Sequence, residues 1–256
     1  MNYSVVIPTH DRTDFLENAI RSVFNQKIRP SEIVVVDDIG LAEVENLIKK
    51  LKKEFSFKIQ YVISNSKNGV SHSYNLGASK VRSEYLAFLD DDDFWGKNYI
   101  EQINKIILNK NIDIILTRLT EFDDLLHTTR SGKCAPHKFN MNDYYLVNPG
   151  VIRSNIFLKR SIFESVNGYD ESIFGSSDKD LFMRLKKIGK THYILDKSNL
   201  VYWRTNHKNQ ASTNPKRMLR NVRRFYKKYF FSIPLSIHIK MIKKISKLFY
   251  LSIQIK

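Results

Sequence analysis

Acidic residues are missing from the last quarter of the chain. Residues 197–256 contain 15 Lys or Arg and no Asp or Glu, whereas residues 1–196 contain 27 basic and 26 acidic residues. The net charge of +16 therefore belongs to the C-terminal end, and the rest of the chain is nearly neutral. A chain polarised in this way is expected to meet an anionic partner through that end, either a membrane surface or nucleic acid.

Cysteine and long apolar runs are also scarce. The single Cys134 cannot form an internal disulfide, which fits a reducing compartment. The longest uncharged apolar run near the end, residues 229–239, is too short to span a bilayer. Met1 leads directly into an apolar run without a basic segment or cleavage site, so no signal peptide is expected. We therefore expect a cytoplasmic protein, whose 42% hydrophobic residues suffice for a globular core.

Four carboxylates, Asp90–Asp93, follow the apolar run 85–89. Such a run is typical of a strand buried on both faces, and ligands of open α/β sheets bind beyond the carboxyl ends of strands. Clustered carboxylate oxygens suit Mg²⁺ or Mn²⁺, which in turn bind phosphate oxygens. The sequence therefore predicts a divalent cation that carries a diphosphate at this strand end. The alternative, usual for an acidic run, is a solvated turn.

The first half of the chain alternates between strand and helix patterns. Strands are predicted at 3–7, 33–36 and 59–63, and helices at 13–24 and 41–55, which indicates a parallel α/β sheet. The second strand ends in Asp37 and Asp38, one of which can bind a base or a ribose hydroxyl, or cap a turn. In the loop 65–71, Lys67 can reach a phosphate, and Gly69 permits an unusual backbone conformation.

The second half carries one candidate for acid–base chemistry. A helix is predicted at 97–109 and strands at 112–117 and 156–158, while residues 121–148 show few signals of either kind. A further helix begins at Ser176 or Ser177 and ends at Gly189. Asp178 lies in its first turn, where the helix dipole favours the ionised carboxylate that a base requires. An aspartate at this place can also serve stability alone.

Six segments together indicate a family. The segments "VVIPTHDR", "EIVVVDD", "NGVSHSYNLGA", "YLAFLDDDDFW", "GYDESIFGSSDKDLFMRLKKIG" and "YWRTNHKNQAS" occur in the order and at the spacing of family 2 glycosyltransferases. The chain resembles this family over roughly residues 3–212. The resemblance implies the GT-A fold, an α/β Rossmann-like architecture with a mixed, mainly parallel sheet flanked by helices. It also implies a catalytic domain at 1–212, with a nucleotide-binding half at 1–95 and an acceptor half at 96–212.

The resemblance also implies roles for single residues, with Mn²⁺ or Mg²⁺ as the cofactor. Asp178 aligns with the catalytic aspartate that accepts the proton of an acceptor hydroxyl. The implied metal ligands are Asp92, Asp90 and His207, although an isolated histidine can equally be a surface residue. The residues implied to bind the nucleotide-diphosphate sugar are Pro8, Thr9, Arg12, Asp38, Lys67, Gly69, Asn75, Asp90 and Asp91.

This chain departs from the family pattern at two positions. Ser177 stands where the family has a glutamate, and Tyr74 stands where an arginine is common. These departures leave open a catalytically idle relative that binds sugar nucleotides. A nucleic-acid-binding protein is the other alternative, but it leaves the acidic strand ends unexplained, because carboxylates without a metal repel phosphate. No nucleic-acid partner is therefore expected.

The C-terminal extension, residues 213–256, has the pattern of a basic amphipathic helix. After Pro234, apolar residues such as Ile242 and Leu248 recur every three to four positions, and lysines such as Lys243 take the other face. Such a helix lies in a membrane interface or packs on the domain with a solvated basic face.

We expect an inverting enzyme that moves a sugar from a nucleotide-diphosphate donor to a hydroxyl of a saccharide acceptor. The resemblance favours a UDP-sugar as the donor. With the tail, it favours a lipid-linked acceptor in surface polysaccharide or glycan assembly. The enzyme is then expected to sit peripherally on the inner face of the cytoplasmic membrane, held to its anionic surface by the tail.

Overall fold

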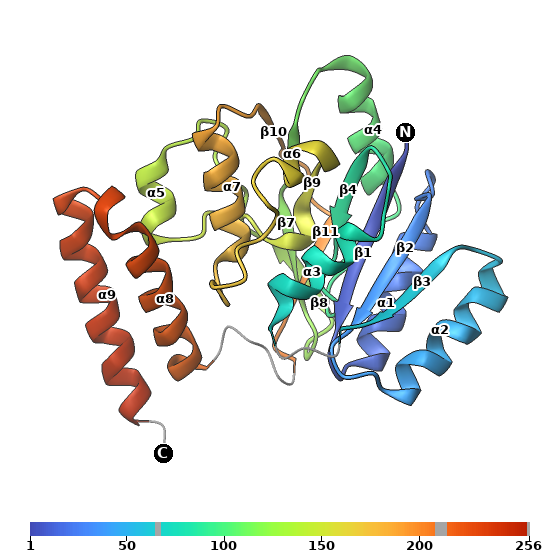
Figure 1. The fold of residues 1–256 in the computed structure, drawn as a ribbon, viewed down its shortest axis with the longest axis horizontal. Coiled ribbons are helices and arrows are strands. Elements are labelled where there is room, and N and C mark those ends of the chain that lie inside the picture. The colour runs from blue at the N-terminus through green and yellow to red at the C-terminus, as the bar shows by residue number, and fades with distance from the viewer. Residues whose placement is uncertain (65–67, 208–213, 255–256) are drawn as a thin grey trace.

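A seven-stranded sheet forms the centre of the computed structural model, which describes residues 1–64, 68–207 and 214–254 (Figure 1). Its strands, in spatial order, are β10 (His192–Leu195), β6 (Ile114–Thr117), β9 (Ile156–Lys159), β4 (Tyr85–Phe88), β1 (Tyr3–Thr9), β2 (Glu32–Asp37) and β3 (Ile59–Ile63). Only β9 runs antiparallel to its neighbours β4 and β6. The predicted α/β fold with a mixed, mainly parallel sheet is confirmed.

Helices cover both faces of this sheet. One face carries α1 (Thr13–Phe24), α2 (Ala42–Phe55) and α4 (Tyr99–Asn109). The other carries α3 (Val70–Ser79), α5 (Met141–Leu146), α6 (Arg160–Glu164) and α7 (Ser177–Lys187). Successive side chains of a strand point to opposite faces, so Val5 and Ile7 join the first layer and Val6 the second. Strands buried on both faces need continuous apolar runs, as the sequence of β1 and β2 provides.

A second, four-stranded sheet corrects the expectation of an irregular segment at 121–148. It has the order β5 (Phe94–Trp95), β11 (Val201–Thr205), β7 (Leu119–Asp123) and β8 (Thr128–Ser131). Strand β8 is exposed along its whole length and has no apolar alternation. It forms because it pairs antiparallel with β7, a long-range cause that a local pattern does not reveal. Helix α5 lies in the same segment.

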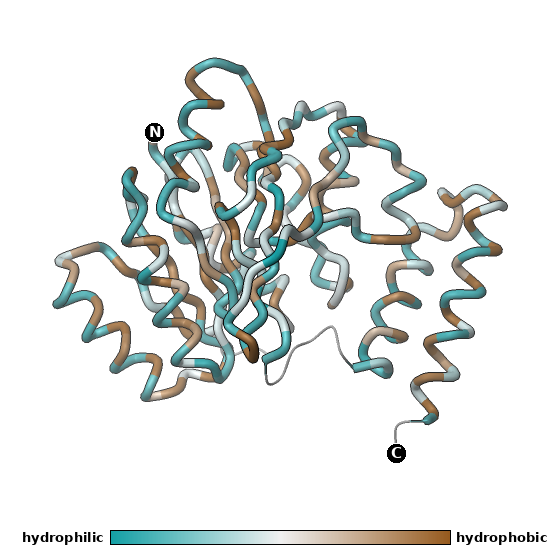
Figure 2. The backbone as a smooth tube through the Cα atoms, turned by 180° about the vertical axis from the view of Figure 1, so that it is seen from behind, coloured by the Kyte–Doolittle hydropathy of each residue, from teal (hydrophilic) through white to brown (hydrophobic). Residues whose placement is uncertain are grey.

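The chain ends in a helical hairpin of α8 (Pro215–Tyr229), the 3-10 turn η3 (Phe230–Ser232) and α9 (Leu235–Gln254), which lies beside α5 and α7 (Figure 1). Apolar and polar segments alternate along α9 in Figure 2. Ile237, Met241 and Leu248 are buried, whereas Ile239 and Ile242 are exposed. The predicted tail helix thus packs on the domain and still presents a second apolar face. None of the helices in the described ranges has the length and apolarity that crossing a membrane requires.

Candidate active site

The four aspartates Asp90–Asp93 form the turn that connects β4 of the large sheet to β5 of the small sheet. We call this turn the acidic turn. It is closed by a hydrogen bond of 3.1 Å from the Asp93 backbone N–H to the Asp90 carbonyl. Strands β1, β2 and β4 are parallel, so their carboxyl ends lie at one edge of the sheet. Thr9, Asp38 and the acidic turn therefore meet there, at the edge where ligands of open α/β sheets bind.

Asp93 faces inward and holds the acidic turn in place. Its carboxylate accepts hydrogen bonds from Ser154 Oγ at 2.5 Å and from the Arg204 backbone N–H at 3.0 Å. Arg204 also donates from Nε to the Asp92 carbonyl at 2.9 Å and forms an ion pair with Asp124. Burial raises the pKa of Asp93 well above its ordinary value. Asp93 and Arg204 are therefore structural supports of the site.

Asp91 is held by the loop that follows β1. Thr9 Oγ1 donates to its carboxylate at 2.8 Å, and Arg12 Nη2 lies 2.7 Å from the other oxygen. Only 2% of the Asp91 side chain is exposed, and burial raises its pKa to about 7, against the opposing charge of Arg12. Arg12 also forms an ion pair with Asp92. The structure thus brings together Thr9, Arg12, Asp91 and Asp92, all of them predicted from the sequence.

Asp92 and His207 lie side by side. His207 Nε2 is 3.3 Å from Asp92 Oδ2, and the imidazole is nearly buried, with its ring in edge contact with Phe15 at 5.3 Å. A carboxylate and an imidazole at this separation can share one cation, because metal–ligand bonds in such sites are about 2 Å long. His207 reaches the site because β11 runs beside β5, which follows the acidic turn directly.

The residues beside the acidic turn fit a divalent cation with few protein ligands. Among residues 1–64, 68–207 and 214–254, no group of three or more His, Cys, Asp or Glu side chains is arranged to hold a metal ion. Mg²⁺ is commonly held by only one or two carboxylates, together with water and substrate phosphates. Asp92 supplies such a carboxylate, whereas the imidazole of His207 beside it suits Mn²⁺ better than Mg²⁺. Asp90, the other predicted ligand, is engaged elsewhere.

The carboxylate of Asp90 contacts two side chains, Tyr74 of α3 and Arg153. Tyr74 donates its hydroxyl to Asp90 Oδ1 at 2.8 Å, and Arg153 Nη1 lies 3.7 Å from the same oxygen. Burial raises the pKa of Asp90, and the charge of Arg153 opposes that rise. The Arg153 guanidinium lies 5.4 Å from the centre of the Tyr74 ring. The guanidinium of Arg153 therefore lies next to Tyr74, the position in α3 where the resembled family commonly has an arginine, although Arg153 itself lies outside α3.

Arg153 also reaches the helix that carries Asp178. Its Nη2 donates to Ser177 Oγ at 2.6 Å. Asp178 follows in the first turn of α7 and is 8% exposed. Burial raises the pKa of Asp178, while the charge of Arg153 favours its ionised form. Sequence reasoning missed Arg153, which lies in the 3-10 turn η1 (Arg153–Asn155) and belongs to no motif. The sequence offered one indirect signal, the missing arginine at Tyr74.

The two aspartates after β2 have different environments. Asp37 is fully buried and accepts hydrogen bonds from three backbone N–H groups, those of residues 39, 40 and 41, each at 2.9 Å. It also accepts a bond from the Tyr61 hydroxyl at 2.8 Å. Asp38 accepts a hydrogen bond from Ser73 Oγ and is partly exposed. Asp37 is therefore the turn residue, and Asp38 is the carboxylate available to a ligand.

The other residues predicted to bind the sugar nucleotide differ in how close they lie to the acidic turn and in whether their side chains are already engaged. Pro8 lies in β1 beside Val36, one residue before Thr9. Gly69 precedes α3 with a φ of 84°, and an added Cβ would lie 2.8 Å from the Phe174 ring. Lys67 lies outside the described residues. Asn75 is occupied by the 168–171 loop, because its amide binds the backbone of Tyr169 at 2.8 Å in both directions.

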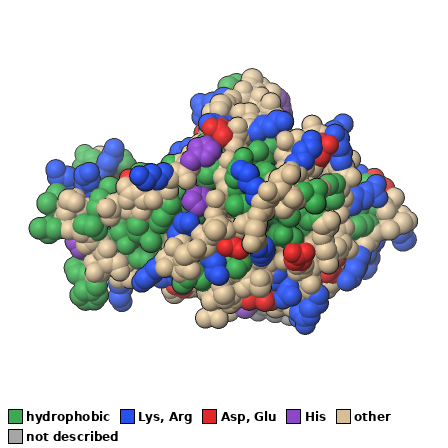
Figure 3. All heavy atoms as spheres, turned by 90° about the horizontal axis from the view of Figure 1, so that it is seen from above, with side chains coloured by type: hydrophobic (Ala, Val, Ile, Leu, Met, Phe, Trp, Pro, Cys, Tyr) green, Lys and Arg blue, Asp and Glu red, His purple; other side chains and the backbone are tan. Residues whose placement is uncertain are grey.

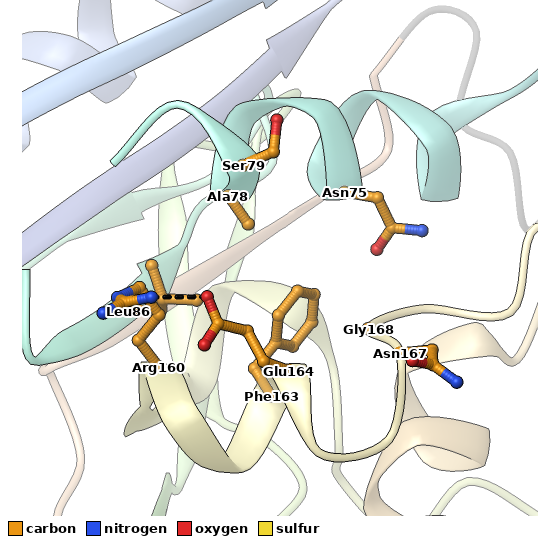
Figure 4. Close-up of a pocket in the computed structure, with 9 residues that line it drawn as sticks. All are labelled: Asn75, Ala78, Ser79, Leu86, Arg160, Phe163, Glu164, Asn167 and Gly168. Carbon is orange, nitrogen blue, oxygen red and sulfur yellow. Dashed lines mark hydrogen bonds and ion pairs between the residues drawn. The ribbon is translucent and has the colours of Figure 1, made fainter. Parts of the chain in front are cut away.

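A pocket of about 360 Å³ lies behind α3 and does not include the acidic turn (Figure 4). Asn75, Ala78 and Ser79 of α3 form one wall, and Phe163 and Glu164 of α6 lie opposite. Glu164 is paired with Arg160 across the floor of the pocket. Asn75 is the single predicted site residue among the residues that line this pocket, which lies apart from the acidic turn and Asp178.

The comparisons with known proteins agree with this geometry. The model of glycosyl transferase family 2 matches residues 4–166, more than half of the chain. A Campylobacter jejuni protein named GalNAc(5)-diNAcBac-PP-undecaprenol beta-1,3-glucosyltransferase is 36% identical over 91 residues, which are 35% of this chain and 29% of the relative. An uncharacterized glycosyltransferase of Rickettsia typhi is 26% identical over 208 residues, which are 77% of this chain and 63% of the relative. The chain thus spans less than two thirds of either relative.

Among solved structures, S. aureus TarS in complex with UDP-GlcNAc superposes with a TM-score of 0.69 at 17% sequence identity. The match covers 88% of this chain and 65% of the TarS chain. At this identity the likeness shows the fold alone, and that fold is the GT-A fold expected from the sequence.

Proposed function

The chain belongs to glycosyl transferase family 2, and on this premise we propose that it moves a sugar from a UDP-sugar to a hydroxyl of a saccharide acceptor, with inversion at the anomeric carbon. One observation carries the proposal. Arg153 links the acidic turn, through Asp90, to the first turn of α7, so that the proposed donor site and the proposed base Asp178 lie on either side of one guanidinium.

The proposed donor site follows the carboxyl ends of β1, β2 and β4. Asp38 accepts a hydrogen bond from the base, and Asp90 and Asp91 lie on the ribose side. Arg12, with Thr9 and Pro8, lies in the loop that meets the diphosphate, where Lys67 and the backbone at Gly69 add further contacts. Support comes from the contacts of Thr9 and Arg12 with Asp91, which place this loop directly on the acidic turn.

Asp92 and His207 are the proposed ligands of Mn²⁺ or Mg²⁺. Bound there, the cation would neutralise negative charge that develops on the departing diphosphate. In the structure the carboxylate of Asp92 is paired with Arg12 and His207, so cation binding would replace at least part of these contacts. Arg12 would then be released toward the phosphate oxygens, where a guanidinium binds well.

Asp178 is the proposed general base. It removes the proton of the acceptor hydroxyl as the oxygen attacks the anomeric carbon from the side opposite the diphosphate. A single displacement of this kind inverts the configuration. The charge of Arg153 supports this role, because it opposes the rise that burial causes in the pKa of Asp178.

The test combines a ligand panel with one substitution. Thermal shifts with UDP-, GDP-, CDP- and dTDP-sugars, each with and without Mn²⁺, identify the nucleobase that the protein prefers and show whether binding requires the cation. In Asp178→Asn we expect unchanged donor binding and transfer reduced by about 10²- to 10⁴-fold, the usual loss for a general base. Glu164→Gln, which alters a carboxylate in the separate pocket, is the matched control and should transfer normally. Near-normal transfer by Asp178→Asn would remove Asp178 from this role.

The acceptor is proposed to be lipid-linked and to meet the enzyme at an anionic membrane surface. The name of the C. jejuni relative describes a substrate on undecaprenol diphosphate. In this chain, exposed apolar side chains accompany basic ones on the hairpin, as the end of the molecule formed by α8 and α9 shows in Figure 3. Phe231 is fully exposed and Leu235 is 77% exposed. Such a surface suits a peripheral position on the inner face of the cytoplasmic membrane.

Point substitutions test the membrane surface better than truncation. Removing the chain after residue 228 would delete the buried side chains of Ile237, Met241 and Leu248, and so damage the fold. Replacing Phe231 and Leu235 together by Ser should instead reduce flotation with vesicles that contain anionic lipid. Leu108→Ser changes an apolar residue of α4 that is 75% exposed, and it should float normally. Undiminished flotation of the double variant would contradict the proposal.

A further inference from the structure

The first turn of α7, which carries Asp178, begins without a side-chain cap from the residue that precedes the helix. Ser176, which precedes α7, adopts the left-handed conformation with a φ of 68°, and its side chain does not cap the helix. Aligned N–H groups at a helix start need partners, and a non-glycine residue at this φ costs energy that the surroundings must offset. Contacts from other elements must therefore fix the position of the first turn of α7.

Lys228 of α8 spans the segment 170–180. Its ammonium lies 2.7 Å from Asp170 Oδ2 and 2.6 Å from Asp180 Oδ1. These two aspartates stand eight residues before and two residues after Asp178 in the sequence. Lys228 thus joins the two ends of the stretch that contains the proposed base. Although burial opposes it, the hydrogen bond from Lys228 lowers the pKa of Asp170 to about 2.

Asp180 is the buried centre of a polar network whose other members are partly exposed. Its side chain is fully buried, and it accepts a hydrogen bond from the Tyr229 hydroxyl at 2.7 Å in addition to the bond from Lys228. Arg184 Nε lies 2.8 Å from its other oxygen. Arg184 also donates to the carbonyls of Val166 and Gly168, each at 2.7 Å. The network therefore ties α8, the loop before α7 and the first turn of α7 into one unit.

Two further contacts of α8 fall on the same stretch. The Arg224 guanidinium lies 4.3 Å from the centre of the Phe174 ring, and the Lys179 ammonium lies 4.0 Å from the centre of the Phe225 ring. Helix α8 therefore touches the residues on both sides of Asp178 in space as well as in sequence. These contacts place α8 directly against the loop and the helix turn that carry Asp178.

We infer that the C-terminal hairpin is part of the catalytic apparatus, with Lys228 as the positioning residue that holds Asp178 in register with the donor. The inference rests on the proposed function of Asp178. It moves the boundary expected at residue 212, because the catalytic unit then includes α8. In this role Lys228 acts through Asp170 and Asp180, which flank Asp178 in the sequence, and not by contact with the substrate.

The test uses Lys228→Met, with Lys228→Arg as the conservative rescue and Lys227→Met as the matched control, since Lys227 is the neighbouring exposed lysine of α8. The assay is run in solution without vesicles, so that membrane binding does not contribute. Loss of base alignment by about 1 Å reduces turnover by up to about 10²-fold, so we expect kcat of Lys228→Met to fall about 10- to 100-fold. The donor KM and the affinity for UDP should stay within about twofold. Lys228→Arg should regain most of kcat, and Lys227→Met should match the wild type.

Different outcomes distinguish the inference about Lys228 from the proposed role of Asp178. Wild-type kcat in folded Lys228→Met, beside an inactive Asp178→Asn, would overturn the inference alone. A parallel loss of UDP affinity and kcat would also overturn it, because that result indicates general loosening. Full activity of Asp178→Asn would instead overturn the proposed function. Should Lys228→Met not fold, Tyr229→Phe removes a single hydrogen bond to Asp180, and a fall in kcat with unchanged UDP affinity is then expected; unchanged kcat would count against the inference.

Discussion

Lys179 offers a test of the packing between the catalytic helix and the C-terminal hairpin. It follows Asp178 directly and is only 4% exposed. Its ammonium donates to the Tyr144 carbonyl at 2.8 Å and lies over the Phe225 ring. Burial, together with the nearby ammonium of Lys244, lowers its pKa from 10.5 to about 7, against the opposing charges of Asp178 and Asp180.

The lowered pKa predicts the direction of a pH effect on stability. Between about pH 7 and pH 10.5 the unfolded chain binds a proton at Lys179 that the folded protein does not bind. Stability therefore rises with pH across this window. Below pH 7 both states carry the proton and the contribution is constant. Each unit of differential pKa corresponds to about 1.4 kcal/mol, so Lys179 should add about 3 kcal/mol between pH 7 and pH 9.5.

Replacing Lys179 by Met removes this dependence while filling a similar volume. We expect the free energy of unfolding of Lys179→Met to lack about 3 kcal/mol of the rise that the wild type shows between pH 7 and pH 9.5. Urea unfolding at several pH values measures it, and Lys187→Met provides the control, because Lys187 is exposed at the other end of the same helix. Parallel pH curves for wild type and Lys179→Met would refute the reasoning, since they would mean that this amine is not desolvated.

Two further substitutions test the supports of the acidic turn and of the β2 turn. Arg153→Met should lower the free energy of unfolding by about 1–3 kcal/mol, because it removes the countercharge of Asp90, whose side chain is only 25% exposed, and urea unfolding should show a smaller loss for Arg153→Lys. A loss below 1 kcal/mol would mean that the pair contributes little. Asp37→Ala should cost about 2–4 kcal/mol, because three backbone N–H groups lose their acceptor, whereas Asp38→Ala should change UDP affinity more than stability. Equal destabilisation by the two changes would contradict the distinction between these aspartates.

The sequence determined the sheet and the place of the site. Apolar runs such as 85–89 bury on both faces wherever they pair, and alternation of such runs with amphipathic helices permits mainly a parallel sheet. Carboxylates that follow the strands must then gather at one edge. For this reason the strand pattern indicates where the acidic turn lies, and the family resemblance adds Thr9 and Arg12 to the same site, where both contact Asp91.

Only the tertiary structure decided how neighbouring residues divide their work. Asp37 and Asp38 are indistinguishable in sequence, yet one binds backbone N–H groups and the other lies open to a ligand. Arg153 and Lys228 belong to no motif, and their partners lie 63 and 48 residues away in sequence, at Asp90 and Asp180. Local patterns record burial and periodicity, which act over a few residues. The pairing of charges in a low-dielectric interior depends instead on which elements pack together, here η1 against the end of β4 and α8 against α7.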